Sequence, residues 1–277
     1  MSEPNHRDES SPRRTRFVGR SDELSALGDA LEDHSLVTIV GPGGAGKTRL
    51  AREFARRSNG FEGVYWCNLV EASSEEALVA EVGRAVELDR DAPADPGQVG
   101  RHIASLGSPL IVLDNLEQIA ASAATVLDIW LDTAPEATFL VTSRHPLRIR
   151  REYQFRLAPL TRESAVELFI ERARRVSDSL EVDDSKRDVI GGIAERLDDL
   201  PLAVELAASR ANLLSPRQLS ERLADGLDLL ESRERDRASR HQTMQATIAW
   251  TWDLLSPPAR QTLAQTSVFA GGCTLEA

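Results

Sequence analysis

The segment that most restricts the fold is a glycine-rich stretch, GPGGAGKT at 41–48. The run before it, LVTIV at 36–40, is short, apolar and rich in β-branched residues, which is typical of a strand buried on both faces of a parallel sheet. The run after it, TRLAREFARRS at 48–58, predicts a helix. A strand, a glycine-rich turn and a helix in this order predict an α/β domain built around one loop.

The loop matches the pattern G-x-x-x-x-G-K-[ST] in full, and its chemistry is that of phosphate binding. Glycines let the backbone curl so that successive N–H groups point inward at phosphate oxygens, and the start of the helix adds its positive end. Lys47 is expected to reach the β- and γ-phosphates, and the Thr48 hydroxyl to bind Mg²⁺. The residues expected to contact ATP or ADP here are Gly41, Gly43, Gly44, Ala45, Gly46, Lys47, Thr48 and Arg49.

Lys47 stands out because almost all basic residues of the chain are arginines. Lys47 and Lys186 are the two lysines among 33 basic residues. A compact ammonium on a slim stem fits between phosphate oxygens inside a tight loop, where a planar guanidinium would crowd the backbone. The choice of lysine at this position therefore supports the phosphate-binding interpretation.

Further apolar runs extend the α/β pattern to about five strands. The predicted strands are 36–40, 63–69, 109–115, 137–144 and 152–158. A helix with Ser21 as N-cap is predicted before the first strand, at 21–33, and helices between later strands are predicted at 48–58, 74–87 and 117–133. DRDAPADPG at 89–97 is interpreted as a surface loop. Alternating strands and helices predict a parallel sheet with helices on both faces.

After Pro159 the sequence predicts only helices. The first has Thr161 as N-cap, and the next cover about 186–198, 201–211 and 215–230. A charged connector at 233–240 leads to two more helices broken at Ser256-Pro257-Pro258. The chain ends after an apolar helix and a Gly-Gly turn, which suggests a chain cut within a domain.

Three polar residues follow predicted strands and are candidates for the chemistry. Asp114 ends a buried strand, where a carboxylate can hold Mg²⁺ through water; taken alone it would be interpreted as a helix N-cap, but together with the glycine-rich loop the Mg²⁺ role is favoured. Glu117 could polarise the attacking water, or could serve only as an acid in the first turn of a helix. Arg144 could reach a γ-phosphate, or could be a solvated surface arginine. Asn115, next to Asp114, cannot accept a proton from water.

Charge and composition exclude several classes of protein. The net charge of −11 does not favour nucleic acid as a partner of the whole surface, although RHPLRIRR at 144–151 could form a local basic patch. No apolar run approaches the roughly 18 residues that span a bilayer, and no signal peptide is visible, so a cytoplasmic location is expected. Cys67 and Cys273 lie too far apart in the sequence to suggest a metal cluster.

Taken in order, seven stretches resemble the STAND class of P-loop ATPases, in particular the NB-ARC-like ATPases of large bacterial transcriptional regulators. The stretches are FVGRSDEL, GPGGAGKT, LIVLDNLEQ, FLVTSR, LAPLTRESAVELF, LDDLPLAVELAA and the segment from Arg240 to Ala277. The resemblance covers about residues 16 to 277. It implies a P-loop NTPase domain at 16–158, a helical lid at 159–235 and a partial winged-helix domain at 236–277, while the polar, charged and proline-containing residues 1–15 predict a disordered tail.

The resemblance also implies roles for individual residues. Val18 and Arg20 would contact the base and nucleotide, Arg144 would sense the phosphate, and Pro201 in the LPL motif would close the lid over the nucleotide. The family's winged helix often locks ADP through a histidine, but His241 does not match that position. The implied function is a switch in which ADP holds a closed state and ATP allows assembly with a protein partner or with itself, with slow Mg²⁺-dependent hydrolysis.

The P-loop is also compatible with three other functions. A DNA-associated ATPase of the AAA+ kind would use the same loop, but the acidic balance makes direct nucleic-acid binding unexpected. A small-molecule kinase would need an acceptor site that the helical half does not suggest. A binding-only relative that holds ADP without hydrolysing it fits the sequence as well.

Overall fold

The computed structural model describes residues 16–88, 95–177, 181–224 and 257–266. The chain divides into two compact units, Met1–Leu160 and Thr161–Ala277. The predicted tail at 1–15, the connector at 233–240, His241 and most of the predicted winged helix lie outside the described residues.

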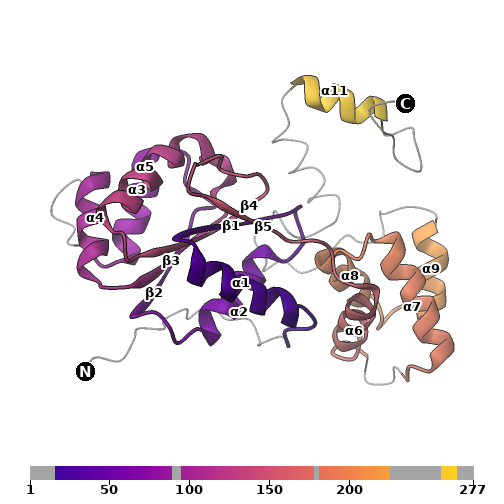
Figure 1. Cartoon of the computed structure of the whole chain (residues 1–277). Helices are drawn as coiled ribbons and strands as arrows, with labels where there is room; N and C mark the ends of the chain where they lie inside the picture. Colours follow the sequence, from indigo (N-terminus) through magenta and orange to yellow (C-terminus); the bar gives the residue numbers. More distant parts are fainter. Residues whose placement is uncertain (1–15, 89–94, 178–180, 225–256, 267–277) are drawn as a thin grey trace. The chain divides into compact units, whose positions relative to one another are not determined.

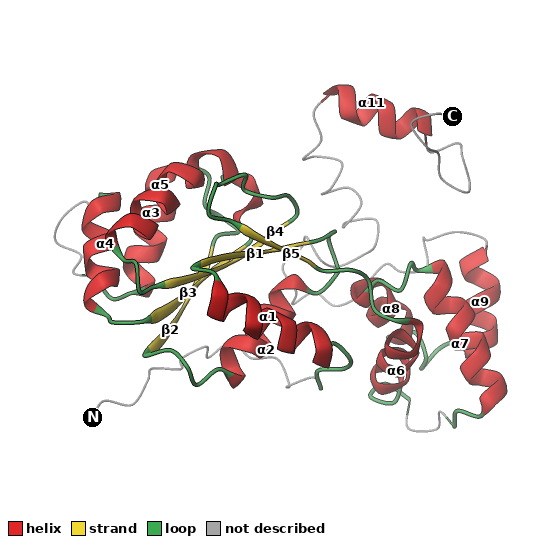
Figure 2. Ribbon diagram, in the orientation of Figure 1, coloured by secondary structure: helices red, strands yellow, loops and turns green. Residues whose placement is uncertain are grey.

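The first unit is built on a five-stranded sheet in the order β2-β3-β4-β1-β5, and every neighbouring pair of strands is parallel (Figure 2). The strands are β1 (Leu36–Val40), β2 (Gly63–Asn68), β3 (Pro109–Asp114), β4 (Thr138–Ser143) and β5 (Tyr153–Arg156). All five predicted strands are confirmed to within a few residues at their ends. The glycine-rich loop leaves β1, which lies between β4 and β5.

Helices cover both faces of this sheet, as predicted (Figure 1). The helices of this unit are α1 (Ser21–Asp33), α2 (Lys47–Arg57), α3 (Glu75–Ala85), α4 (Pro96–Ser105), the 3₁₀ turn η1 (Leu116–Gln118) and α5 (Ala120–Thr133). Successive β3 residues face opposite sides, so Ile111 belongs to the core that includes residues of α3, α4 and α5, whereas Val112 belongs to the core that includes residues of α1 and α2. Burial on both faces explains why β3 reads as a continuous apolar run.

Two local predictions about helix starts are wrong. Ser21 is the first residue of α1 and Arg20 is its N-cap, with a left-handed φ of 63°. The predicted surface loop at 89–97 ends too late, because Asp95 caps α4 by accepting a hydrogen bond from the Gln98 N–H at 2.8 Å. Asp before Pro is a helix-start signal, since Pro96 at the first helical position lacks an N–H that would go unused there.

In the described part of the second unit, residues 161–177, 181–224 and 257–266, the regular structure is entirely helical. The helices are α6 (Arg162–Ala173), α7 (Asp184–Arg196), α8 (Pro201–Ala208), α9 (Pro216–Ala224) and α11 (Pro257–Thr266). Thr161 caps α6 as predicted, by accepting a hydrogen bond from the Ser164 N–H at 3.2 Å. Helix α6 packs on α7 and α8, and α7 packs on α9.

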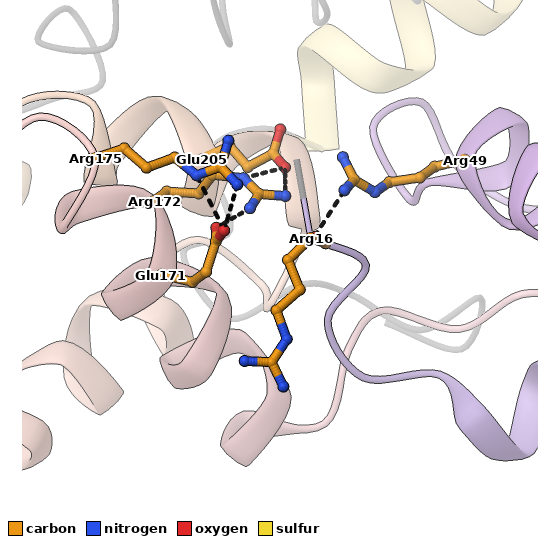
Figure 3. A network of polar contacts seen from close by, with 6 residues as sticks. All are labelled: Arg16, Arg49, Glu171, Arg172, Arg175 and Glu205. Atoms are coloured by element: carbon orange, nitrogen blue, oxygen red, sulfur yellow. Dashed lines mark hydrogen bonds and ion pairs between the residues drawn. The ribbon is translucent and has the colours of Figure 1, made fainter. Parts of the chain in front are cut away.

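Ion pairs add to the apolar packing of α6 against α8. Arg172 Nε donates to Glu205 Oε1 at 3.0 Å, and Glu171 accepts from both Arg172 and Arg175 (Figure 3). The Arg172 side chain is only 9% exposed, so its pairing with Glu205 is largely shielded from solvent, whereas the Arg175 side chain is 37% exposed.

A second pairing fixes the turn that leads into α8. Arg162 donates to both carboxylate oxygens of Asp199, at 2.7 and 3.0 Å. Asp198 and Asp199 both have left-handed φ angles, 53° and 51°, a conformation that costs energy outside glycine. The bidentate contact therefore helps hold the turn that places Pro201 at the first position of α8.

Among the described residues, no helix combines the length and the apolar character that crossing a membrane requires.

Candidate functional site

The glycine-rich loop has the conformation that phosphate binding needs. Gly44 and Gly46 have φ angles of 79° and 92°, which side chains rarely allow. Gly46 is the N-cap of α2 and makes no side-chain cap bond to its first turn, an arrangement that suits the binding of an anion at the helix N-terminus. A Cβ at Gly41 would lie 2.8 Å from the Leu157 carbonyl oxygen, so glycine is needed there for close backbone approach.

The Lys47 ammonium lies across the loop that precedes it. Nζ donates to the carbonyl oxygens of Gly41 at 2.8 Å and Pro42 at 3.0 Å. Burial, opposed by Glu117 and Asp114 and reinforced by Arg144, lowers the pKa of Lys47 to about 8. These electrostatic influences place the loop, both acids and Arg144 of the sequence-based prediction within one local site.

Asp114 is the centre of a hydroxyl cluster at the carboxyl end of β3. It is 2% exposed, and its Oδ1 accepts from the Thr48 hydroxyl at 2.7 Å and from the Thr142 hydroxyl at 2.6 Å. Burial raises the pKa of Asp114, and the two hydroxyl bonds act against that rise. The interpretation of Asp114 as only a helix cap lacks support, because its acceptor bonds run to the loop and to β4.

The same cluster fits a magnesium ion. A hydroxyl and a carboxylate oxygen are hard ligands of the kind that Mg²⁺ prefers, and Mg²⁺ usually takes few protein ligands while it keeps water and phosphate oxygens. Within the described residues no group of three or more acidic, histidine or cysteine side chains could hold a metal by itself. Thr48 and Asp114 therefore suit a metal that arrives with phosphates rather than a self-contained metal cage.

Thr142 also belongs to the hydroxyl cluster around Asp114, although the sequence alone predicted no role for it in the site. Its Oγ1 donates to Asp114 and accepts from the Asn115 N–H at 3.0 Å, so it joins the ends of β3 and β4. The available signal was a buried threonine one residue before the end of a strand. That signal becomes specific only once β4 is known to be the neighbour of β3.

A buried ion pair completes the site. Asn115 has a left-handed φ of 65° and turns the chain into η1, which brings Glu117 round to Arg144. Arg144 Nε lies 3.4 Å from Glu117 Oε1, and the two side chains are only 6% and 3% exposed. Burial lowers the pKa of Arg144 while Glu117 raises it. Arg144 is therefore not a solvated surface arginine.

Two other predicted nucleotide contacts make backbone contacts in this structure. Arg20 Nη2 donates to the carbonyl oxygens of Ala45 at 3.0 Å and Ala158 at 2.8 Å. Arg49 Nη2 donates to the Arg16 carbonyl at 2.8 Å, which ties α2 to the segment before α1 (Figure 3). The nucleotide contacts of Arg20, Arg49 and the half-buried Val18 stay predictions, as does that of Pro201 in the second unit.

The predicted basic patch at 144–151 is weaker than its sequence suggests. Arg144 is buried in the site, and Leu147 and Ile149 are buried in the core. Arg151 Nη2 lies 2.8 Å from Asp132 Oδ1, so part of the exposed charge is paired.

The lowered pKa of Lys47 predicts how nucleotide affinity depends on pH. Above about pH 8 the free protein loses the Lys47 proton, whereas bound phosphates would retain it, so binding takes up a proton. We expect ADP affinity to be nearly constant between pH 6.5 and 7.5 and to fall by up to about tenfold per pH unit above pH 8. Calorimetry in buffers of different ionisation enthalpy measures that uptake directly. Equal affinity at pH 7.5 and 9.5, with no proton uptake, would contradict the assignment.

The parallel sheet, the loop after β1 and the acid at the end of β3 define the chain as a P-loop NTPase in fold. A profile of the AAA ATPase domain family matches residues 16–204, more than half of the chain, and the chain belongs to this family. Membership of an ATPase domain family implies nucleotide binding.

Two relatives from Mycobacterium tuberculosis align over most of the chain. The uncharacterized protein Rv0894 is 35% identical over 271 residues, which cover 95% of this chain and 67% of that protein. Rv0890c, provisionally named an HTH-type transcriptional regulator, is 34% identical over 252 residues, covering 89% of this chain and 28% of that protein. The chain thus spans little more than a quarter of the second relative.

Solved structures share the fold at low sequence identity. The Walker-type ATPase of Pyrococcus abyssi superposes with a TM-score of 0.60 at 17% identity, covering 92% of this chain and 91% of that one. A STAND protein of Pyrococcus horikoshii with a tetratricopeptide repeat sensor gives a TM-score of 0.52 at 20% identity, covering 94% of this chain and 36% of that one. At these identities the likeness concerns the fold alone.

Proposed function

We propose that this chain is an ATP/ADP-dependent regulatory switch of the STAND type with slow Mg²⁺-dependent hydrolysis. The observation that carries the proposal is the buried pair of Glu117 and Arg144, whose charges both act on Lys47. A pair of this kind can exist in two arrangements, one with the carboxylate as partner of the arginine and one with a phosphate.

The nucleotide would be held mainly by the loop and by Lys47. The first-turn N–H groups of α2 and the Lys47 ammonium supply positive potential toward the β- and γ-phosphates. Thr48 and Asp114 would hold Mg²⁺, which neutralises charge that develops on the phosphate oxygens when it is bound. Val18 is proposed to lie against the base, and Pro201 to belong to the lid.

Arg144 would distinguish ATP from ADP. A γ-phosphate that approaches Arg144 competes with Glu117 for the same guanidinium, and the bidentate geometry of arginine suits phosphate. Only after that exchange is the Glu117 carboxylate released to polarise water. Because Asn115 cannot act as a base, hydrolysis depends on this rearrangement, which fits a slow switch.

The partner of the switch is proposed from the class of its relatives. The provisional name of Rv0890c points to gene regulation, and the STAND protein of Pyrococcus horikoshii is a signal-transduction ATPase. We propose a protein partner, or assembly with further copies of the chain, in the ATP state, in the cytoplasm. Direct DNA binding is not proposed, since the net charge is −11 and Arg151 of the basic stretch is paired.

Size-exclusion chromatography and limited proteolysis, each with ADP and with a non-hydrolysable ATP analogue plus Mg²⁺, test the switch. We expect the two nucleotides to give different elution volumes or cleavage patterns. Replacing Arg144 by Met should leave ADP affinity within about threefold of the wild type. It should abolish the difference between the ADP and ATP-analogue profiles, because no guanidinium is left at this position to bind the γ-phosphate.

The double variant Glu117→Gln/Arg144→Met is the matched control for that test, since it avoids leaving a buried carboxylate without its ion-pair partner. Identical profiles for ADP and the ATP analogue in the wild type would favour a binding-only relative. Nucleotide-dependent retention on DNA at physiological salt would favour a DNA-associated ATPase.

A further inference from the structure

Arg20, whose side chain contacts the loop, has a left-handed backbone conformation. Its φ of 63° follows a φ of 67° at Gly19, so two consecutive residues adopt the left-handed conformation just before α1. Arginine rarely adopts this conformation, and such strain persists when surrounding contacts over-determine it. Only 7% of Arg20 is exposed, so its guanidinium is committed to contacts inside the protein.

Those contacts reach both the loop and the strand that ends beside it. Nη2 donates to the Ala45 carbonyl within the loop at 3.0 Å and to the Ala158 carbonyl at 2.8 Å, while Nη1 donates to Glu23 Oε1 at 3.0 Å. Ala45 itself is fully buried. One guanidinium therefore joins the middle of the glycine-rich loop to the segment that follows β5.

The segment that follows β5 is a firm anchor for this bridge. The Leu157 N–H donates to the Val40 carbonyl at 2.8 Å, which continues the pairing of β1 with β5. The Leu157 carbonyl also lies so close to Gly41 that even a methyl group there would clash. The start of the loop is thus fixed by backbone contacts, and its middle is fixed through Arg20.

The Ala45 contact has a consequence for the next N–H. A trans peptide directs its N–H away from its C=O, and the described residues contain no cis peptide. With the Ala45 carbonyl held by Arg20, the Gly46 N–H points in the opposite direction within the plane of the same peptide. Rotation of this peptide would move one of the donors that a phosphate needs.

We infer that Arg20 is a positioning residue of the phosphate-binding loop, which acts by clamping the Ala45–Gly46 peptide. The inference rests on the proposed nucleotide site, and it differs from a direct contact of Arg20 with the base. A clamp affects the binding of any phosphate chain, whether or not a base is attached. A base contact affects only ligands that carry a base.

The test compares inorganic pyrophosphate, ADP and adenosine on Arg20→Met. We expect the affinities for ADP and for pyrophosphate to fall by the same factor, roughly tenfold, because one loop donor is misplaced. Adenosine, measured as a competitor of a fluorescent ADP analogue, should bind as in the wild type. Arg20→Lys, whose ammonium reaches one carbonyl at a time, should recover part of the loss, and Glu23→Gln, which keeps both carbonyl contacts, should bind like the wild type.

Two results would overturn the clamp: unchanged pyrophosphate affinity with weakened adenosine binding, which identifies a base contact, or no change for any ligand.

Amide hydrogen exchange without ligand provides a separate readout. The Leu50 N–H donates to the Gly46 carbonyl at 2.9 Å, so a loosened Ala45–Gly46 peptide should speed exchange at Leu50 in Arg20→Met and not in Glu23→Gln. If the wild type binds neither ADP nor pyrophosphate, the proposed function fails, and unaltered Leu50 exchange would then also reject the clamp. Should Arg20→Met not fold, Arg20→Lys carries the same comparison, with an intermediate loss expected.

Discussion

Replacing Lys47 by Ala is expected to reduce ADP and ATP affinity by about 100-fold or more. Lys47 is the cation of the loop, and its ammonium donates hydrogen bonds to the loop carbonyls of Gly41 and Pro42. Bound phosphates would replace these carbonyls as its partners. Removing one member of a charge-assisted contact in a partly buried site costs about 2–5 kcal/mol, which corresponds to a loss of roughly 30-fold to several thousand-fold, and the middle of that range exceeds 100-fold. Calorimetric titration with ADP measures the effect.

The chain provides a matched control for that experiment, because its only other lysine lies in the second unit. Lys186 is on α7, and its Nζ donates to the Glu181 carbonyl at the surface. Lys186→Ala removes the same charge and should leave ADP affinity within about twofold of the wild type. Unchanged ADP affinity in Lys47→Ala, with a normal melting temperature, would contradict the assignment of the loop.

Replacing Asp114 by Asn is expected to abolish the gain in nucleotide affinity that Mg²⁺ provides and to lower any ATP hydrolysis by about 100-fold or more. Asparagine keeps the size of the side chain and an acceptor oxygen for the Thr48 and Thr142 hydroxyls, but it loses the charge that attracts the metal. ADP affinity in the presence of EDTA should change by no more than about threefold. Titrations with and without Mg²⁺ separate the two effects.

The nucleotide-free stability of this variant supplies an internal check on folding. Burial raises the pKa of Asp114, which means that the ionised carboxylate is costly in the folded state at neutral pH. Removing the charge should therefore leave the melting temperature of the free protein equal or higher. Asp188→Asn, at an exposed position on α7, is the surface control and should behave as the wild type in every titration. A full response of Asp114→Asn to Mg²⁺ would rule out this carboxylate as a metal ligand.

Much of the fold could be predicted because its signals are local. Strands β1, β3 and β4 were predicted from short apolar runs, since they are buried almost throughout and burial on both faces of a parallel sheet demands apolar residues. Helix α4 was missed because proline and aspartate dominate its start, and these residues are as common in loops as at helix N-termini. Likewise, Ser21 has the chemistry of an N-cap, but the contacts of Arg20 move the start of α1 by one residue.

The site shows the same division. By itself the sequence determined the loop, its lysine and threonine, and an acid at the end of a strand, because adjacent residues and a strand end suffice to specify them. Only the tertiary structure decided that Thr142 serves Asp114, that Glu117 and Arg144 form a buried pair, and that Arg20 clamps the loop. The residues in these contacts lie between 25 and 138 positions apart in the chain. They meet because β4 pairs with both β1 and β3, and β5 pairs with β1. Strand order sets which strand ends become neighbours, and no local pattern of residues records it.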